Sequence, residues 1–386
     1  MKLLHLSDLH LGKRVNEFSM REDQAYILQQ ILGIIDREQP DGVLIAGDVY
    51  DKSVPSADAV TMLDGFLVQL SARPMQTFVI SGNHDSAERL AFGGRLMAQS
   101  GIHIAPVYGG TLTPLTLTDA YGPGDIYLLP FLKPAQVRNI FPEREIATYT
   151  DAVAAVLEQA NVDAERRNVL VTHQFVTGTG IEVECSDSEE LSVGGTDSVD
   201  VSLFRDFDYV ALGHIHRPQQ VGRETVRYCG TPLKYSFSEA KHRKSVTVVE
   251  LAQKGSVTVR TVPLTPLHDM IELRGTYNEL MLRDFYAGTT WQEDYVHITL
   301  TDEDDIPNAI ANLRTVYHGL MKLDYDNRRT RAGTVPVGAA DTEHKSPLTL
   351  LGEFYEQQNG QPMSEEQEKF AQELIEHIWE GEECDR

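Results

Sequence analysis

Seven side chains that can bind metal ions occur at intervals along the chain, each at or just after the end of an apolar run. They are Asp8, His10, Asp48, Asn83, His173, His214 and His216. Carboxylate, imidazole and amide groups in this combination are the ligands of dinuclear hydrolytic centres. The pattern therefore predicts a two-metal site whose chemistry is phosphoester hydrolysis.

The spacing of these residues indicates how each could contribute. Asp8 and His10 are two positions apart just past a predicted strand, so both side chains point the same way and can hold one cation. Asp48 has two carboxylate oxygens and can bridge two ions, and Asn83 offers an amide oxygen without added charge. A second pair with the same spacing follows Gly213. Ligands of this kind without a thiolate favour Mn²⁺, with Mg²⁺, Fe or Zn²⁺ also possible.

Each motif alone is weak evidence for a metal site, and the prediction rests on the presence of all five motifs together. Gly-Asp dipeptides are common, and a single strand-end histidine is more often a satisfied polar residue than a ligand. Five such motifs, each at a predicted strand end, point to metal far more strongly. His5 lacks this support and is expected in the core or behind the ligands. Asp51 and Asp85 are expected to orient ligands through hydrogen bonds.

The elements that must position these residues alternate between strand and helix. Short apolar strands are predicted at Leu3–Ser7, Gly42–Gly47 and Thr77–Ser81, with helices over Arg21–Glu38 and Ser56–Leu70 between them. Further strands are predicted at Asp125–Leu129, Asn168–Thr172, Tyr209–Gly213, Val226–Cys229, Ser245–Leu251 and Ser256–Val262. This order predicts an α/β fold of two packed sheets flanked by helices, with the site at the strand ends.

The chain changes character after this segment, which we take as a catalytic domain over residues 1–262. Prolines at 263 and 266 interrupt the last strand, and a smaller α/β capping domain is predicted over residues 263–323. Its expected elements are strands at Asp269–Arg274, Tyr295–Leu300 and Met321–Tyr325 and a helix at Asn308–His318. Residues 324–345 have no periodicity and are predicted to be a flexible linker.

Residues 346–386 are predicted to form a helix pair. Ser346 and Pro347 are typical of a helix start, and Ser364 with Gln367 makes a capping box. The apolar stripes of the two helices can pack on the chain's own body or on a partner. The preceding linker and the shortness of the pair favour a partner.

The composition bears on the number of domains, the cellular compartment and the class of substrate. The chain has 386 residues, 41% of them hydrophobic, which allows two or three domains. It shows no membrane-spanning run and no signal peptide, and its three cysteines form no CxxC pair, so we expect a cytoplasmic protein. The net charge of −24 opposes nucleic-acid binding, but it is uneven. Basic residues outnumber acids between Arg205 and Lys244, whereas acids dominate after Ser346, so net charge leaves the substrate open.

The motifs DLH, GDVYD, GNHD and GHIH resemble those of the calcineurin-like metallophosphoesterases, which are four-layer αββα sandwiches with a dinuclear metal site. The longer segments LHLSDLHLGK, GDVYDKSVPS, LPFLKP, ALGHIHRPQ and YCGTPLKYSFSE are similar to the SbcD family of nuclease subunits from bacterial SbcC–SbcD complexes. This resemblance covers nearly the whole chain, including the cap and the helix pair.

The resemblance implies two ligand sets that share one carboxylate. One ion would be held by Asp8, His10, Asp48 and His216, and the other by Asp48, Asn83, His173 and His214. His84 would face the scissile phosphate and stabilise charge or protonate the leaving oxygen. Archaeal and eukaryotic relatives carry a histidine three residues after the bridging aspartate, where this chain has Asp51.

The resemblance also implies a function. It indicates a DNA repair and recombination nuclease with 3′→5′ exonuclease action on duplex ends and endonuclease action on single strands and hairpins. It further implies docking of residues 346–386 on an SbcC-type coiled-coil ATPase, and a homodimer.

Two other functions remain open from the sequence. The same metal core occurs in phosphodiesterases and phosphatases that act on small nucleotides or phosphoproteins, and a degenerate fold can act as a non-catalytic scaffold. The complete ligand set argues against the scaffold. The sequence also leaves open whether the acidic segment Gly178–Asp200 is a mobile lid over the site.

Overall fold

The first sheet is built around β1 (Lys2–Leu6), whose side chains alternate between two apolar interiors. Its strand order is β16-β15-β1-β4-β5-β6. Strands β1, β4, β5 and β6 run parallel, and β15 and β16 add an antiparallel pair beside β1. The bounds are β4 (Gly42–Ala46), β5 (Gln76–Ile80), β6 (Ile102–Ala105), β15 (Ser245–Leu251) and β16 (Val257–Pro263). The parallel strands therefore all end at one edge of this sheet.

The computed structural model describes residues 1–189, 197–328, 330, 347–359, 362–364, 366–372 and 374. The chain divides into two units, Met1–Tyr325 and Asp326–Arg386. The two large sheets and the smaller sheet that follows them all belong to the first unit.

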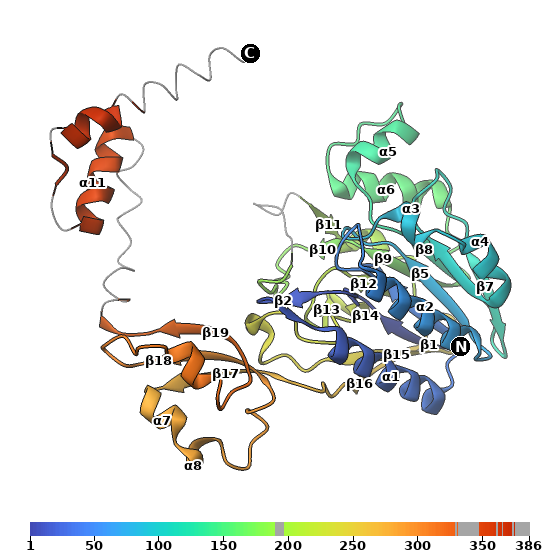
Figure 1. The fold of residues 1–386 in the computed structure, drawn as a ribbon. Coiled ribbons are helices and arrows are strands. Elements are labelled where there is room, and N and C mark those ends of the chain that lie inside the picture. Colours follow the sequence, from blue (N-terminus) through green and yellow to red (C-terminus); the bar gives the residue numbers. More distant parts are fainter. Residues whose placement is uncertain are drawn as a thin grey trace. The chain divides into compact units, whose positions relative to one another are not determined.

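Helices α1 (Arg21–Glu38) and α2 (Ala57–Ser71) cover the outer face of the first sheet (Figure 1). α1 presents Ile27, Ile31 and Ile35 at helical spacing, and these pack with Leu4 and Leu6 of β1. α2 begins at the predicted N-cap, where the Ser56 hydroxyl accepts a hydrogen bond from the Ala59 amide at 3.3 Å. Both predicted helices are confirmed.

The second sheet has the order β13-β14-β12-β9-β8-β7. Its four central strands are parallel and its two edge strands are antiparallel. The bounds are β7 (Leu115–Asp119), β8 (Gly122–Leu129), β9 (Arg167–His173), β12 (Tyr209–Gly213), β13 (Gln219–Val221) and β14 (Arg223–Tyr228). Helices α5 (Pro134–Ile140) and α6 (Tyr149–Ala160) cover its outer face, where Val153 packs with Leu170 and Val210.

The inner faces of the two sheets form a shared core. Leu3 and Val249 of the first sheet pack there with Val171 and Ala211 of the second, all fully buried or nearly so. Each of the leucine and valine side chains contributes about 1.5–3 kcal/mol by burial. Helix, sheet, sheet and helix therefore follow one another, and the predicted four-layer αββα fold is confirmed.

Short elements connect these layers. They are β2 (Arg14–Val15), β3 (Phe18–Ser19), α3 (Ala87–Leu90), α4 (Gly94–Met97), η1 (Ala98–Ser100), β10 (Phe175–Thr177), β11 (Ser198–Asp200), η3 (Val201–Phe204) and η4 (Phe237–Glu239).

A smaller parallel sheet follows β16. It consists of β17 (Met270–Gly275), β18 (Tyr295–Leu300) and β19 (Gly319–Tyr325), with helices α7 (Tyr277–Met281), α8 (Arg283–Tyr286) and α9 (Ala309–Leu313). The predicted helix over Asn308–His318 ends at Leu313. Beyond it the chain turns so that the Tyr317 side chain is buried and donates a hydrogen bond to the Leu280 carbonyl at 2.7 Å. That tertiary contact outweighs the local helical pattern.

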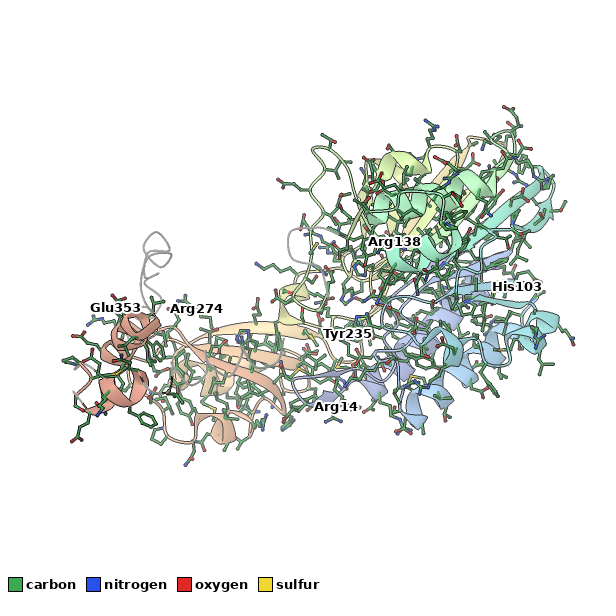
Figure 2. All side chains as sticks on the ribbon, turned by 90° about the horizontal axis from the view of Figure 1, so that it is seen from above. Arg14, His103, Arg138, Tyr235, Arg274 and Glu353 are labelled. Carbon is green, nitrogen blue, oxygen red and sulfur yellow. The ribbon has the colours of Figure 1, made fainter. Side chains whose placement is uncertain are left out.

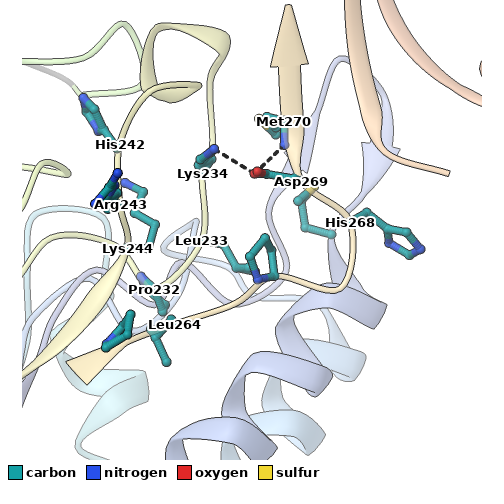
Figure 3. A pocket seen from close by; sticks show the side chains of 13 residues that line it. Pro232, Leu233, Lys234, His242, Arg243, Lys244, Leu264, His268, Asp269 and Met270 are labelled. Carbon is teal, nitrogen blue, oxygen red and sulfur yellow. Dashed lines mark hydrogen bonds and ion pairs between the residues drawn. The ribbon is translucent and has the colours of Figure 1, made fainter. Parts of the chain in front are cut away.

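This smaller sheet joins the sandwich through apolar and polar contacts, since Met270, Tyr295 and Met321 belong to the same buried apolar cluster as β1 and α1. The buried Asp23 carboxylate on α1 accepts hydrogen bonds from the Tyr295 hydroxyl at 2.6 Å and from the His268 amide at 3.0 Å. Figure 3 shows a pocket of about 210 Å³ at this junction, where Lys234 and Asp269 form an ion pair of 2.7 Å. The cap is therefore fixed to the sandwich on its α1 side.

The second unit contains α11 (Pro347–Asn359) and helical residues over 366–372 and at 374. The predicted capping box is present, since the Ser364 amide donates to Gln367 Oε1 at 2.9 Å and the Gln367 amide to Ser364 Oγ at 3.3 Å. Large apolar side chains of both helices are exposed, with Phe354 at 59% and Phe370 at 67%. Most of the predicted linker, and residues after 374, lie outside the described residues.

Comparison with the predicted elements shows where local patterns fail. Every predicted strand is present within three residues of its expected bounds, and β19 reaches Tyr325, so residues 324 and 325 belong to the cap rather than to the linker. Sequence patterns did not indicate β6, β7, β13, α5 and α6. Among the described residues no helix is both long and apolar enough to cross a bilayer.

Candidate metal centre

The ends of strands from both sheets meet at one place. The loops after β1 and β4 pair through their backbones, with the Asp8 amide donating to Gly47 O at 3.1 Å and the His10 amide to Asp48 O at 2.9 Å. The fully buried Asp8 carboxylate then accepts the His214 amide, at 3.0 Å to Oδ1 and 3.2 Å to Oδ2. The two sheets are thus joined directly at the predicted site.

The backbone is strained at the predicted ligands. Asp8, His10, Asp48 and His214 have φ values of 53°, 44°, 47° and 101°. A left-handed backbone in a non-glycine residue costs about 1–3 kcal/mol and persists only where its surroundings enforce it. Such strain is concentrated at functional sites, which supports this position independently of the side-chain chemistry.

Close approach of the two sheets requires glycine at two points. At Gly47, which has a φ of +83°, a Cβ atom would overlap the His173 ring. At Gly213 a Cβ atom would overlap the Ala46 carbonyl and the same ring. These two glycines allow β4, β9 and β12 to approach closely enough for their ligands to share one site.

The first predicted ligand set is assembled. The Nε2 atoms of His10 and His216 are 3.2 Å apart, and ligand atoms of Asp8, His10 and His216 all lie within 4.8 Å of one another. Two nitrogens that each sit about 2.1 Å from a common ion are separated by roughly 3–4 Å. The observed spacing fits a shared cation.

The second predicted set lies beside it. Asn83 Oδ1 is 3.0 Å from His173 Nε2 and 3.0 Å from His214 Nδ1. Asp48 Oδ2 is 3.3 Å from His173 Nε2 and 3.8 Å from His10 Nε2, so one carboxylate oxygen faces both sets. The structure thus brings all seven predicted ligands together, in the arrangement that a bridging Asp48 requires. The ligand assignment itself stays a prediction.

Protonation of the histidines also fits cation binding. Burial lowers the pKa of His214 to about 3, and burial holds the pKa of His10 well below its usual value. Both imidazoles are therefore neutral at pH 7, as ligands must be. Burial opposes charge on His173 too, but the Asp48 and Asp8 carboxylates outweigh it and raise the pKa of His173 to about 9.

His84 lies at the edge of the centre. Its Nδ1 is 3.1 Å from the Asp51 carbonyl, which can only accept, so Nδ1 carries the hydrogen. Its Nε2 is 3.9 Å from Asp48 Oδ2, and its amide donates to Asp48 Oδ1 at 2.9 Å. The imidazole is thereby held with Nε2 towards the centre, as expected for a group that faces substrate.

The structure gives Asp51 and Asp85 different supporting contacts. Asp51 orients His84 through its backbone carbonyl, while its side chain pairs with Lys13 at 2.7 Å. Asp85 accepts the amides of Val49, Tyr50 and Gly82 at 2.9–3.1 Å, which ties the loops after β4 and β5 together. Burial and the nearby Asp48 raise the pKa of Asp85 to about 6. Their supporting roles stay predictions.

His5 is not part of the centre. It is fully buried between the sheets, where Nδ1 lies 2.9 Å from the Tyr209 hydroxyl. Burial lowers its pKa to about 3. This agrees with the expected core position.

Sequence reasoning missed a polar cluster behind His216. His216 Nδ1 is 2.7 Å from Ser188 Oγ, which donates to Glu239 Oε1 at 2.5 Å. The fully buried Glu239 also pairs with Lys244, whose ammonium donates to the His216 carbonyl at 2.9 Å. Burial alone would raise the pKa of Glu239, but Lys244 and His216 hold it well below its usual range.

This cluster fixes the orientation of His216. Ser188 Oγ gives its proton to Glu239, so it accepts from Nδ1–H of His216, and Nε2 faces His10 as a free lone pair. Tyr235, labelled in Figure 2, lies beside His216, and its hydroxyl donates a hydrogen bond to the Leu9 carbonyl at 2.7 Å. The sequence signals were the acidic Glu239 within the otherwise basic segment before β15 and its place at the end of the family-like segment YCGTPLKYSFSE. Whether Gly178–Asp200 is a mobile lid stays open, since residues 190–196 lie outside the described residues.

We predict that Mn²⁺ binding depends on pH through His173. With a pKa of about 9, this imidazole carries a proton on Nε2 at pH 7 in the metal-free protein, and a cation must displace that proton. The Kd should fall by about tenfold per pH unit from pH 7 to 8.5, with release of up to one proton. Calorimetry in buffers of different ionisation enthalpy measures both quantities. A flat Kd over this range would contradict the assignment, and His173→Gln should remove the dependence.

A second prediction concerns the cluster behind His216. The double variant Glu239→Ala/Lys244→Met removes the buried pair without leaving an unpaired charge. Because His216 then loses the group that orients it, Mn²⁺ affinity should fall about 10- to 100-fold, measured by calorimetry. The exposed variant Glu272→Ala is the control. Unchanged affinity in a folded double variant would show that the cluster only stabilises the fold.

Comparisons with known proteins agree with this geometry. A family model described as calcineurin-like phosphoesterase matches residues 1–218, which include all seven predicted ligands. A second, described as type 5 capsule protein repressor C-terminal domain, matches residues 266–359.

Curated relatives match over almost the entire chain. A protein named as the SbcD subunit of the SbcCD nuclease from Staphylococcus epidermidis is 30% identical over 385 residues, covering 98% of this chain and 99% of the relative. The protein of the same name from Staphylococcus saprophyticus is 31% identical over 383 residues, covering 97% and 98%. A solved dimetal phosphatase from Danio rerio overlaps at a TM-score of 0.40 and 14% identity, over 69% of this chain and 99% of that chain. That overlap is too low to bear on fold or function. The matched family and the clustered ligands together show that the chain belongs to the calcineurin-like phosphoesterases, a family of metal-dependent hydrolases, and within it to the SbcD subunits of SbcCD nucleases.

Proposed function

We propose that this chain is the nuclease subunit of an SbcC–SbcD-type complex and hydrolyses DNA phosphodiesters with two divalent ions, for which the ligand set favours Mn²⁺. The observation that carries the proposal is that Asp48 faces both ligand sets while His84 lies beside it with Nε2 towards the centre. The names of the curated relatives, matched over nearly their full length, support a nuclease rather than another phosphoesterase.

The chemistry divides between the ions and the side chains. Two bound divalent ions supply a reactive water at neutral pH and neutralise charge on the phosphate oxygens. Asp8 and Asp48 provide the negative charge that holds both cations. The Ala46 carbonyl holds the His173 imidazole at 2.8 Å, and the imidazoles of His10 and His214 are buried, so little reorganisation is needed when substrate binds.

His84 acts on the substrate in this scheme. The Asp51 carbonyl accepts its Nδ1–H, so Nε2 is the nitrogen that can give a proton to the leaving oxygen or hydrogen-bond to the phosphate. Its ring lies edge-on to His10 at 5.0 Å, which limits rotation. Its side chain is partly exposed, as contact with substrate requires.

The cap and the helix pair favour a macromolecular substrate and a partner. We propose 3′→5′ exonuclease action on duplex ends and endonuclease action on single strands and hairpins, in a cytoplasmic homodimer. Residues 346–386 are proposed to dock on an SbcC-type coiled-coil ATPase. Exposed Phe354 and Phe370 on helices of this segment support a helix-in-groove contact, since such apolar groups are otherwise unfavourable in water.

The second candidate is a phosphodiesterase or phosphatase for small substrates. It shares the same centre but has no use for the cap or for an exposed apolar helix pair. A non-catalytic scaffold is disfavoured because all seven ligands converge.

We predict Mn²⁺-dependent cleavage of hairpin DNA, and its loss in His84→Ala. Loss of a positioned proton donor should lower kcat by about 10²- to 10⁴-fold, while Mn²⁺ affinity stays within about twofold because His84 is not a ligand. Cleavage is followed on gels beside hydrolysis of bis-p-nitrophenyl phosphate, with the exposed His318→Ala as control. Activity confined to the small ester would contradict the nuclease proposal, and loss of Mn²⁺ binding would show that His84 is a ligand.

We also predict that the helix pair holds the partner. The variant Phe354→Glu/Phe370→Glu should abolish co-purification with a co-expressed SbcC-type ATPase, because charged groups cannot enter an apolar groove. Hydrolysis of bis-p-nitrophenyl phosphate should persist, since the metal centre lies in the other unit. Glu356→Ala, exposed on the same helix, is the control. Full retention of the ATPase by the double variant would contradict the proposal.

A further inference from the structure

A pocket of about 340 Å³ adjoins the second ligand set. The loops after β5, β6 and β8 and one side of α5 line it, and its wall includes Asn83, Tyr108, Phe131, Lys133 and Asn139. Asn83 is the predicted ligand that lies 3.0 Å from both His173 and His214. The pocket and the metal centre therefore share a wall, and a molecule with its phosphate at the ions can extend into the pocket.

Phe131 contributes an aromatic ring to the pocket wall, beside the predicted ligands. Its ring centroid is 6.4 Å from that of His214, at an interplanar angle of 25°, and 6.2 Å from that of His173. Its amide donates to the Ser81 carbonyl at 3.1 Å, which fixes the loop after β8 against the loop after β5. An aromatic ring held in this way is a stacking platform for a nucleobase.

The rest of the lining suits a nucleoside. The Tyr108 ring is buried, and its hydroxyl donates to Gln159 Oε1 at 2.5 Å, so it serves as a fixed apolar wall. Lys133 and Asn139 are exposed, and no described residue forms an ion pair with the Lys133 ammonium group. A hollow of this size whose wall combines apolar side chains with polar groups can hold a small organic ligand.

A second pocket lies at the junction of cap and sandwich (Figure 3), and its wall differs from that of the pocket beside Asn83. Its two lysines are already paired, Lys234 with Asp269 and Lys244 with Glu239, and Arg243 also lines it. Among the described residues that line it, none is a predicted ligand and none is Phe, Tyr or Trp. The pocket beside Asn83 therefore suits a nucleoside better than the pocket at the junction.

We propose that this pocket receives the nucleoside attached to the scissile phosphate, with its base stacked on Phe131. The inference rests on the proposed nuclease function and names the part of the substrate that this region recognises. Stacking needs only the face of a base, so recognition here is independent of sequence.

The test compares nucleotides with a phosphate that lacks a base. Thymidine 5′-monophosphate, thymidine 3′-monophosphate and methyl phosphate are measured as inhibitors of Mn²⁺-dependent hydrolysis of methyl p-nitrophenyl phosphate. At least one nucleotide should inhibit the wild-type protein more tightly than methyl phosphate does. Phe131→Ala should raise the Ki of that nucleotide about fivefold or more and leave the Ki of methyl phosphate within about twofold.

A second variant keeps the test independent of the imidazoles that Phe131 contacts. Val107 is 54% exposed on the pocket wall, and Val107→Trp should obstruct the pocket and raise the Ki of the nucleotide alone. Tyr121→Ala removes an exposed aromatic ring on the β7–β8 turn and should change no Ki. Equal inhibition by all three compounds, or equal losses for nucleotide and methyl phosphate in both variants, would overturn the proposal.

Failure of this inference is distinguishable from failure of the nuclease proposal. If the wild-type protein cuts DNA but both variants have the wild-type Ki for the nucleotides, the assignment of the pocket is wrong and the nuclease proposal stands. If DNA is not cut while the nucleotides still depend on Phe131, the substrate is a smaller nucleotide ester.

Discussion

The buried Asp8 carboxylate is the interaction on which the centre depends. Both of its oxygens accept the His214 amide, and its own amide donates to the Gly47 carbonyl. One residue thus connects β1 and β4 of the first sheet with β12 of the second. A charge without exposure to water is costly unless it is paired, and burial raises the pKa of Asp8. Nearby histidines offset part of that cost, and a bound cation would offset more.

This constraint explains why strain and function coincide. Asp8, Asp48 and His214 adopt left-handed backbone conformations because each loop must turn sharply at the junction of the two sheets. The packed core between the sheets holds those turns in place. Loops after five parallel strands can therefore deliver ligands to one small volume, although the ligands come from distant parts of the chain. The fold provides the preorganisation that a hydrolytic centre needs.

The sequence predicted which seven side chains would lie together because their signal is local, and their assignment as metal ligands stays a prediction. A polar residue such as Asp48 or His173 at the end of a buried strand is conspicuous, and parallel strands necessarily place their ends together. Strand and helix periodicity predicted two packed sheets flanked by helices, but it did not indicate α5 and α6, which cover the second sheet. Local patterns did not predict features that tertiary contacts determine. The burial of Tyr317 ends α9 early, and the role of Glu239 depends on its contacts with Ser188 and Lys244. Likewise Phe131 stood within a recognisable motif, but only the structure shows its ring beside His214 and next to a pocket.

The central claim is that separated side chains hold two cations through a shared Asp48 carboxylate. Anomalous diffraction from crystals grown with Mn²⁺ tests it most directly. The account predicts two peaks about 3.5–4 Å apart, one beside His10 and His216 and the other beside Asn83, His173 and His214, with Asp48 between them. A single peak, or two peaks that do not share Asp48, would contradict it.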